Sequence, residues 1–181
     1  MLAPLSIEAE DKKKKRVCIY YSHKDIKYLL RLQTHFASYG RKNVIDIWDA
    51  TKISAGAQWR EEIENALETT KVAVLLVSAD FLASEFIAEN ELPPLLKAAE
   101  SGGTIVLPVI ISPCVFEDTP LQAFQAINHP SEPLSKLTGS RRDEVWVKLV
   151  KFIMKMVNNW ASIQIDEQGK KRKPDGIFLP L

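Results

Sequence analysis

Short apolar runs alternate with amphipathic helical patterns along this chain, and this alternation constrains the fold more than any other feature. The run Val72–Val77 is apolar throughout and has the length of a strand, as expected of a parallel strand that is covered on both faces. The pattern predicts strands at 17–21, 44–48, 72–77 and 104–111, helices at 26–40, 58–69, 90–101 and 141–158, and a fifth strand at 124–127.

This order of strands and helices predicts an α/β fold. Right-handed crossovers between successive strands give a parallel sheet. The expected architecture is a flavodoxin-like, doubly wound sandwich of about five parallel strands with helices on both faces, and its ligands bind beyond the carboxyl ends of the strands. Residues 17–158 form the predicted domain, with a basic N-terminal arm at 1–16 and a polar, basic tail or linker at 159–181.

Charge and composition argue against several classes of protein. Apolar residues make up 46% and charged residues 26% of the 181 residues, which is ordinary globular usage. Nine basic side chains lie within residues 12–16 and 170–173, so residues 17–160 are slightly acidic. A body that coats nucleic acid needs a basic face, and no apolar run approaches the ~20 residues of a membrane span. We therefore expect neither a nucleic-acid nor a membrane partner.

Common cofactor and metal motifs are absent from the sequence. The seven glycines form neither GxGxxG nor GxxxxGK, which argues against the usual dinucleotide and P-loop motifs. The three histidines share no metal-ligand spacing with Cys18 and Cys114, so no metal site is predicted. Two cysteines in apolar segments are expected to be buried thiols of a cytoplasmic protein. Ser22 and His23 are adjacent, and consecutive residues rarely form a working Ser–His pair, so we interpret them as a surface turn.

Glu91 lies in the segment after the predicted strand 72–77, where a ligand crevice is expected. The prolines at 93–94 are tolerated only in the first turn of a helix, which places Glu91 at a helix start. Glu91 is then either a first-turn carboxylate that interacts with the helix dipole, or a functional carboxylate that faces the crevice beside Phe86 and Ile87 and stabilises a developing cation. Burial and the dipole shift a carboxyl pKa in opposite directions, so no protonation state is predicted.

Three segments, in order, resemble motifs of the TIR domain family, and within it the bacterial TIR proteins that consume NAD. VCIYYSHKD at 17–25 resembles the first motif, and WDATKISAGAQW at 48–59 resembles the loop after the second strand. SEFIAENEL at 84–92 resembles the stretch that ends in Glu-Leu, whose glutamate is catalytic in TIR enzymes. The resemblance spans about residues 16–157.

The resemblance implies a set of site residues. The catalytic glutamate falls on Glu91, because Glu91 and not Glu89 precedes leucine as the motif requires. Many members carry Trp four residues before this glutamate, where this chain has Ile87, so an aromatic wall would come from Phe86 or Trp48. The other implied NAD-binding residues follow the first and second strands: Tyr21, Ser22, Trp48, Asp49, Ile53 and Gly56.

A single carboxylate suffices for the implied reaction. Ordinary glycosidases need a second, acidic carboxyl group to protonate a poor leaving group. In NAD the nicotinamide is a pyridinium, which leaves as a neutral molecule without a proton. What remains is to stabilise the oxocarbenium-like ribose, by an anion near C1′ or by hydrogen bonds to the ribose hydroxyls, and we assign this role to Glu91. NAD is then the substrate, no further cofactor is expected, and a metal is unnecessary.

The resemblance also implies self-association. In the family the loop at 49–57 docks into a neighbouring TIR domain and completes a shared site; its other interpretation is a surface connection that turns at Gly56. The first hypothesis is an assembly-activated NAD glycohydrolase in defence or immune-type signalling, giving nicotinamide and ADP-ribose or a cyclic form. The second is a non-catalytic TIR scaffold, and the third is a ribosyl-transferring enzyme on a similar sheet. The basic residues 170–173 are interpreted as a solvated arm or as a linker to a sensor domain or other activating partner.

Overall fold

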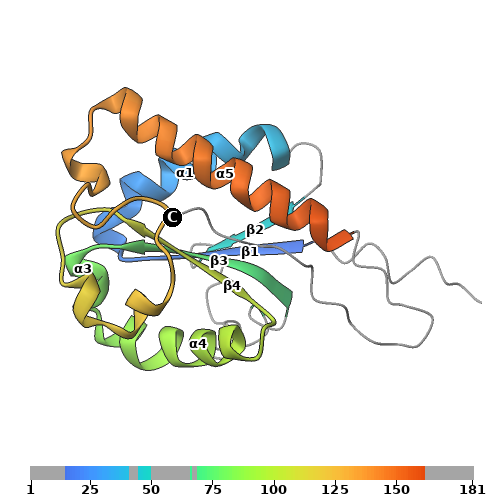
Figure 1. The fold of residues 1–181 in the computed structure, drawn as a ribbon, viewed down its shortest axis with the longest axis horizontal. Coiled ribbons are helices and arrows are strands. Elements are labelled where there is room, and N and C mark those ends of the chain that lie inside the picture. The colour runs from blue at the N-terminus through green and yellow to red at the C-terminus, as the bar shows by residue number, and fades with distance from the viewer. Residues whose placement is uncertain (1–14, 41–44, 50–65, 67–68, 162–181) are drawn as a thin grey trace, which may run out of the picture.

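One parallel β-sheet organises the fold (Figure 1). The computed structural model describes residues 15–40, 45–49, 66 and 69–161. Its strands pair in parallel in the order β2-β1-β3-β4. Their bounds are Lys15–Tyr21 for β1, Ile45–Asp49 for β2, Thr70–Val77 for β3 and Ile105–Ile110 for β4. A parallel sheet with helices around it confirms the flavodoxin-like fold class that the alternating pattern predicts.

Helices cover both faces of the sheet. α1 (Ile26–Gly40) and the long α5 (Gly139–Ala161) lie over one face, whereas α3 (Ala79–Leu82) and α4 (Leu92–Glu100) lie over the other (Figure 1). The short turns are η2 (His23–Asp25), the π-helical η4 (Ile87–Glu91), η5 (Phe116–Asp118), η6 (Pro120–Ala123) and η7 (Leu134–Lys136). The helix predicted at 58–69 lies mostly outside the described residues. Within the described ranges, no helix is both long enough and apolar enough to cross a membrane.

Side chains of the strands alternate between two separate cores, because successive residues of a strand point to opposite faces. From β1, Val17 and Ile19 join the core beneath α1 and α5, which we call the α1–α5 face. Cys18 and Tyr20 join the core against α3 and α4, which we call the α4 face. Residues 72–77 of β3 are all fully buried, as the continuous apolar run predicts.

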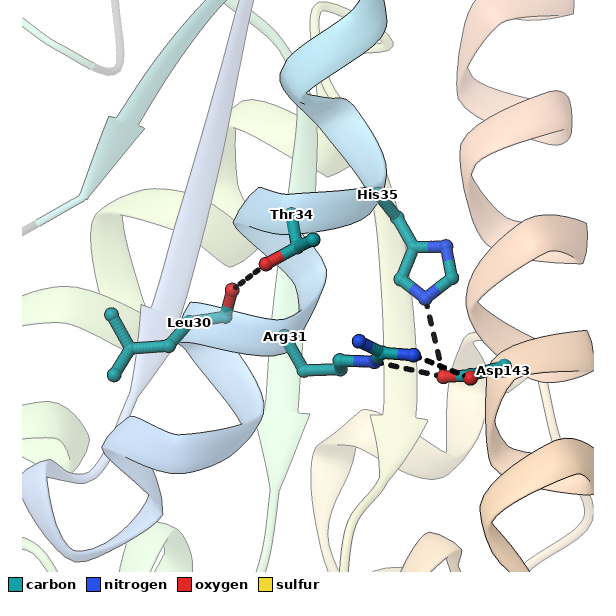
Figure 2. A network of polar contacts seen from close by, with 5 residues as sticks. All are labelled: Leu30, Arg31, Thr34, His35 and Asp143. Carbon is teal, nitrogen blue, oxygen red and sulfur yellow. Dashed lines mark hydrogen bonds and ion pairs between the residues drawn. The ribbon is translucent and has the colours of Figure 1, made fainter.

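A polar contact at the surface joins α1 to α5. Figure 2 shows Arg31 and His35 of α1 reaching the carboxylate of Asp143 on α5. Arg31 Nε donates to Asp143 Oδ1 at 2.9 Å, and His35 Nε2 lies 3.3 Å from the same oxygen. The Arg31 guanidinium holds the pKa of Asp143 at about 2. Because the Arg31 side chain is half exposed, we expect this ion pair to orient the two helices and to contribute little to stability.

The fifth strand predicted at 124–127 does not form, although this segment runs along the outer edge of β4. One main-chain hydrogen bond joins the two, from the N–H of Ile127 to the carbonyl of Pro108 at 2.9 Å. Pro108 has no N–H to give in return. The N–H and C=O of Ile110, two residues further along β4, bond instead to the side-chain amide of Asn128 at 3.0 Å each. A proline and a side-chain amide thus end the sheet.

The strand order reverses at β1, which lies between β2 and β3. The chain leaves β1 for β2 on one side and returns to β3 on the other side. In open α/β sheets a ligand crevice forms at such a reversal, beyond the carboxyl ends of the two central strands. In this chain those ends are Tyr21 of β1 and Val77 of β3.

Candidate active site

A cavity of about 390 Å³ opens at the carboxyl end of β1, beside the segment that follows β3. This is where the reversed strand order places a ligand crevice. Its described lining consists of Tyr21, Ser22, His23, Ser84, Phe86, Ile87 and Glu91. The cavity therefore brings together two segments that lie more than 60 residues apart, 21–23 and 84–91.

Glu91 directly precedes α4 and the prolines at 93–94 lie in the first turn of α4, as the sequence predicts, but a wide helical turn already precedes this helix and ends at Glu91. Helical backbone begins at Glu85 and continues through η4 into α4. In η4 the N–H of Leu92 bonds to the carbonyl of Ile87, five residues back. The prolines at 93–94 cannot donate hydrogen bonds to the preceding turn, and we attribute the widening to them. Such π-turns are frequent at functional sites.

The Glu91 side chain is buried, with only 5% of its surface exposed. It makes no hydrogen bond that would cap α4. Among the described residues, no cation or hydrogen-bond donor contacts its carboxyl group, and burial raises its pKa from 4.5 to about 7. A carboxyl group that is half ionised near neutral pH in a cavity has the character of a functional group. The first-turn interpretation does not account for this burial.

Two phenol groups lie near Glu91. Tyr20 is 2% exposed, and its hydroxyl finds no hydrogen-bond partner in the described part of the chain. Burial, followed by the charges of Cys18 and Glu91, raises the pKa of Tyr20. Burial, followed by the charges of Asp49 and Glu91, also raises the pKa of Tyr21. Both phenols therefore stay neutral and remain hydrogen-bond donors at physiological pH.

Of the two aromatic residues that the sequence offers in place of the family's Trp, Phe86 lines the cavity. Phe86 is 41% exposed. Trp48 is instead buried in the core of the α4 face. Asp49 is fully buried and accepts a hydrogen bond from Gln33 Nε2 at 3.0 Å. Neither Trp48 nor Asp49 is among the described residues that line the cavity.

Two other predicted site residues, Ile53 and Gly56, lie outside the described residues. The same holds for residues 50–57 of the predicted docking loop at 49–57. Residues 1–14 of the predicted arm at 1–16 and residues 162–181 of the predicted tail at 159–181 are outside the described ranges as well; residues 15–16 begin β1, and residues 159–161 end α5.

His23 lines the cavity although the sequence predicts only a surface turn for it, whereas Tyr21 and Ser22, which the resemblance implies as NAD-binding residues, line the cavity beside it. His23 begins η2, and the Ser22 hydroxyl caps this turn by accepting a hydrogen bond from the N–H of Lys24 at 3.4 Å. The signal that identifies His23 is topological, because it closely follows the strand at which the order reverses. Sequence spacing alone does not distinguish such a turn from any other surface turn.

The cavity combines few chemical groups. One buried carboxyl group can carry a negative charge toward a cationic ligand. The Ser22 and Ser84 hydroxyls can bond to ligand hydroxyls, and Phe86 with Ile87 offers an apolar wall for a flat ring. In the described ranges, no group of three or more His, Cys, Asp or Glu side chains could hold a metal ion.

Other hollows lie away from this carboxyl group. A shallow groove of about 810 Å³ follows the outer side of α5 and includes Lys148, Lys151 and Phe152. A smaller hollow of about 340 Å³ lies between α1 and α5 beside Arg31 and Arg142. Neither is lined by a buried carboxylate, so the cavity at Glu91 is the better candidate for chemistry.

Comparison with known proteins agrees with the architecture. The family model described as "TIR domain" matches residues 17–138. A curated protein of Sinorhizobium fredii, uncharacterized protein y4lF, is 28% identical over 133 residues, which are 74% of this chain and 41% of that protein. The chain thus spans about two fifths of the length of this curated relative. The crystal structure of the TIR domain of the Toll-related receptor TRR-2 from Hydra magnipapillata has a TM-score of 0.52 at 17% identity and covers 77% of this chain and 96% of that one.

Proposed function

The chain belongs to the TIR domain family, and on this premise we propose that it is an NAD glycohydrolase in which Glu91 is the catalytic carboxylate. The observation that carries the proposal is the burial of Glu91 in a cavity at the carboxyl end of β1, where no described cation compensates its charge. A buried anion without a counterion favours a ligand that brings a positive charge.

The chemistry of NAD matches this requirement. The bond between C1′ of the ribose and the nicotinamide nitrogen breaks, and its electron pair returns to the nitrogen, so the ring leaves as a neutral molecule. Positive charge then develops on the ribose, and the carboxylate of Glu91 stabilises it. Water attacks C1′ and releases its proton to solvent, which gives ADP-ribose. An internal attack by the adenine would give a cyclic form instead.

The pKa of Glu91 supports the same assignment. With a pKa of about 7 in the free protein, the carboxyl group is about half ionised at neutral pH. A pyridinium ring bound nearby favours the charged form and lowers this pKa, so the cationic substrate itself promotes the active state. The uncharged, reduced form of the cofactor lacks this effect and is not expected to be cleaved.

Assembly belongs to the same proposal. TIR domains generally self-associate, and we propose that activity depends on contacts between copies through the loop at 49–57. An additional sensor domain or activating partner fits a chain that spans about two fifths of its curated relative. Defence or immune-type signalling in the cytoplasm is the setting that we propose for such an activity.

Nicotinamide release from NAD tests the proposal. The protein is incubated with NAD at low and at high protein concentration, and nicotinamide, ADP-ribose and cyclic products are separated by chromatography. We expect NAD loss to rise more than linearly with protein concentration and to vanish in Glu91→Ala. Glu89→Ala is the matched control, because Glu89 lies on the same turn η4 but is exposed. Full turnover by folded Glu91→Ala would refute the assignment.

A non-catalytic scaffold is the second candidate, and Ile87 is the observation that favours it. Ile87 is buried where many family members carry Trp, so the cavity lacks that aromatic wall. If no condition gives NAD loss from the folded protein while self-association persists, the scaffold replaces the enzyme. A third candidate, ribosyl transfer, predicts that an added competing base is incorporated into the product.

A further inference from the structure

Two walls enclose the cavity at Glu91, and they come from segments far apart in the sequence. One wall is the turn that carries Ser22 and His23 into η2. This turn has only three helical residues, and its own cap, from Lys24 N to Ser22 Oγ, is long at 3.4 Å. The other wall, residues 84–91, follows the four-residue helix α3 and leads through η4 into α4. The two walls belong to different helices, so the spacing between them depends on contacts that join the two segments.

One buried hydrogen bond connects the first wall to the start of α3, the helix that leads to the second wall. The hydroxyl of Ser78 donates to Oδ2 of Asp25 at 2.5 Å. Asp25 is the last residue of η2 and is 7% exposed, and Ser78 is 1% exposed. The Ser78 oxygen also accepts a hydrogen bond from the N–H of Phe81 at 3.0 Å, which caps α3. A single hydroxyl therefore ties the first wall, the end of β3 and the start of α3 to one point.

We propose that Asp25 and Ser78 are positioning residues for the Glu91 site, and that their hydrogen bond holds the two walls at the spacing that a ligand needs. The role in turnover rests on the proposed function; the geometric role does not. Neither residue lines the cavity among the described residues, so both act through the segments that they hold.

Burial makes this bond strong. A carboxylate that accepts a hydrogen bond away from solvent gains more from it than an exposed carboxylate does. Burial raises the pKa of Asp25, and the bond from Ser78 opposes this rise. The charged groups that act on Asp25 are Asp80, Lys27 and Lys24.

The same two segments carry a second, exposed contact that serves as an internal control. Lys24 of η2 donates to Asp80 of α3 at 2.6 Å, with 73% and 43% of the two side chains exposed. Solvent screens such a pair, so it fixes geometry poorly. If holding the walls requires a buried bond, removal of Lys24 is expected to change little.

Glu91 itself provides a readout that does not depend on any reaction. Its pKa of about 7 results from burial. Walls that loosen admit water and return the pKa toward its ordinary value of 4.5. Carbon-13 NMR of labelled glutamate side chains, assigned with Glu91→Gln, follows this pKa in each variant of the full chain.

The test compares Asp25→Ala with Lys24→Ala. Asp25→Ala removes the buried bond but leaves the cap of α3 intact. We expect the Glu91 pKa to fall well below 7 and kcat/KM for NAD to drop about ten- to a hundred-fold, the cost of misplacing reacting groups by up to an ångström. In Lys24→Ala both quantities should stay at the wild-type level. A wild-type Glu91 pKa and wild-type kcat/KM in folded Asp25→Ala would overturn the proposal.

Conservative variants keep the test decisive if Asp25→Ala does not fold. Asp25→Asn retains an acceptor but loses the charge, and we expect a smaller fall in the same two quantities. Ser78→Thr retains the hydroxyl and should keep the Glu91 pKa and kcat/KM at the wild-type level. Ser78→Ala removes the hydroxyl and should lower both quantities. Identical values in Asp25→Asn, Ser78→Ala and wild type would equally overturn the positioning role.

The two proposals fail in different ways. If wild type releases no nicotinamide while Asp25→Ala still lowers the Glu91 pKa, the positioning role stands and the proposed enzyme is refuted. If wild type is active but Asp25→Ala changes neither the pKa nor kcat/KM, the enzyme stands and the positioning role is refuted.

Discussion

The two faces of the sheet differ in the chemistry of their buried groups. The α1–α5 face buries an apolar cluster that includes Phe36, Trp146 and Leu149. Its main polar link, between Arg31 and Asp143, lies at the surface (Figure 2). The α4 face carries the buried carboxyl group of Glu91 and the buried hydroxyl of Tyr20, neither with a partner among the described residues. The α1–α5 face is thus an ordinary apolar core. The α4 face instead buries polar groups beside a cavity, without partners among the described residues.

This contrast indicates where stability and function lie in the molecule. Buried polar groups without partners reduce stability. Perturbed groups of this kind gather at functional sites, where the loss is offset by packing elsewhere. We therefore expect substitutions on the α1–α5 face to change the free energy of unfolding, and substitutions on the α4 face around Glu91 to change activity.

Phe36→Ala should give the largest change in stability. Phe36 is fully buried on the α1–α5 face, and truncation of a buried Phe costs about 3–5 kcal/mol. Urea unfolding measures this loss. Thr34→Ala, an exposed change on the same helix, should alter stability by less than about 0.5 kcal/mol. If Phe36→Ala lowers the free energy of unfolding only slightly, the α1–α5 face does not supply the main stability of the fold, and its contrast with the α4 face fails.

Glu91→Gln should change how stability depends on pH. The folded pKa of Glu91 lies above its ordinary value, so the native state binds more protons between pH 4.5 and 7. Stability from this group is therefore fully present below pH 4.5 and is lost as pH rises through about 7, by roughly 3 kcal/mol. Urea unfolding across this range should show this loss in wild type and in Glu89→Gln, but not in Glu91→Gln. If the free energy of unfolding depends on pH in the same way in wild type, Glu89→Gln and Glu91→Gln, then Glu91 is not a buried group that titrates near pH 7.

Tyr20→Phe should stabilise the protein slightly. The Tyr20 hydroxyl is buried without a partner among the described residues, and removal of such a group relieves a desolvation cost of about 1 kcal/mol. Thermal and urea unfolding measure the change. Destabilisation instead would reveal a hydrogen bond to this hydroxyl and bring the α4 face closer to an ordinary core.

Arg31→Ala should give the smallest effect. Arg31 and Asp143 are both well exposed, so solvent screens their attraction. We expect a shift in the unfolding midpoint smaller than that of Tyr20→Phe, and one that disappears at high salt. A large, salt-independent loss would show that the α1–α5 face depends on a polar contact as well as on apolar packing.

The sequence predicts the regular parts of this fold well, because their signals are local. The run at 72–77 is apolar throughout since both faces of β3 are covered, and the strand order places the crevice after Tyr21. Glu91 was identified from a family motif, and its cavity lies where the parallel sheet places one.

Three features were not predicted from the sequence, and two of them depend on contacts between residues far apart in the chain. The prolines at 93–94 do lie in the first turn of α4, but the helical backbone that precedes them and widens into η4 was not predicted. The segment at 124–127 resembled a strand, but Pro108 and Asn128 occupy the edge that it would need. The bond between Asp25 and Ser78 joins residues 53 positions apart, and only the register of β1 and β3 brings them together.

The pH dependence of kcat/KM for NAD cleavage tests the central claim most directly, because it reports ionisation of the essential group in the free enzyme. If Glu91 acts as a buried carboxylate, kcat/KM rises with pH through an apparent pKa near 7, and this activity is absent in Glu91→Gln while Glu89→Gln retains the whole profile. A rate that does not vary between pH 5 and about 8, or turnover that survives in Glu91→Gln, would contradict the account.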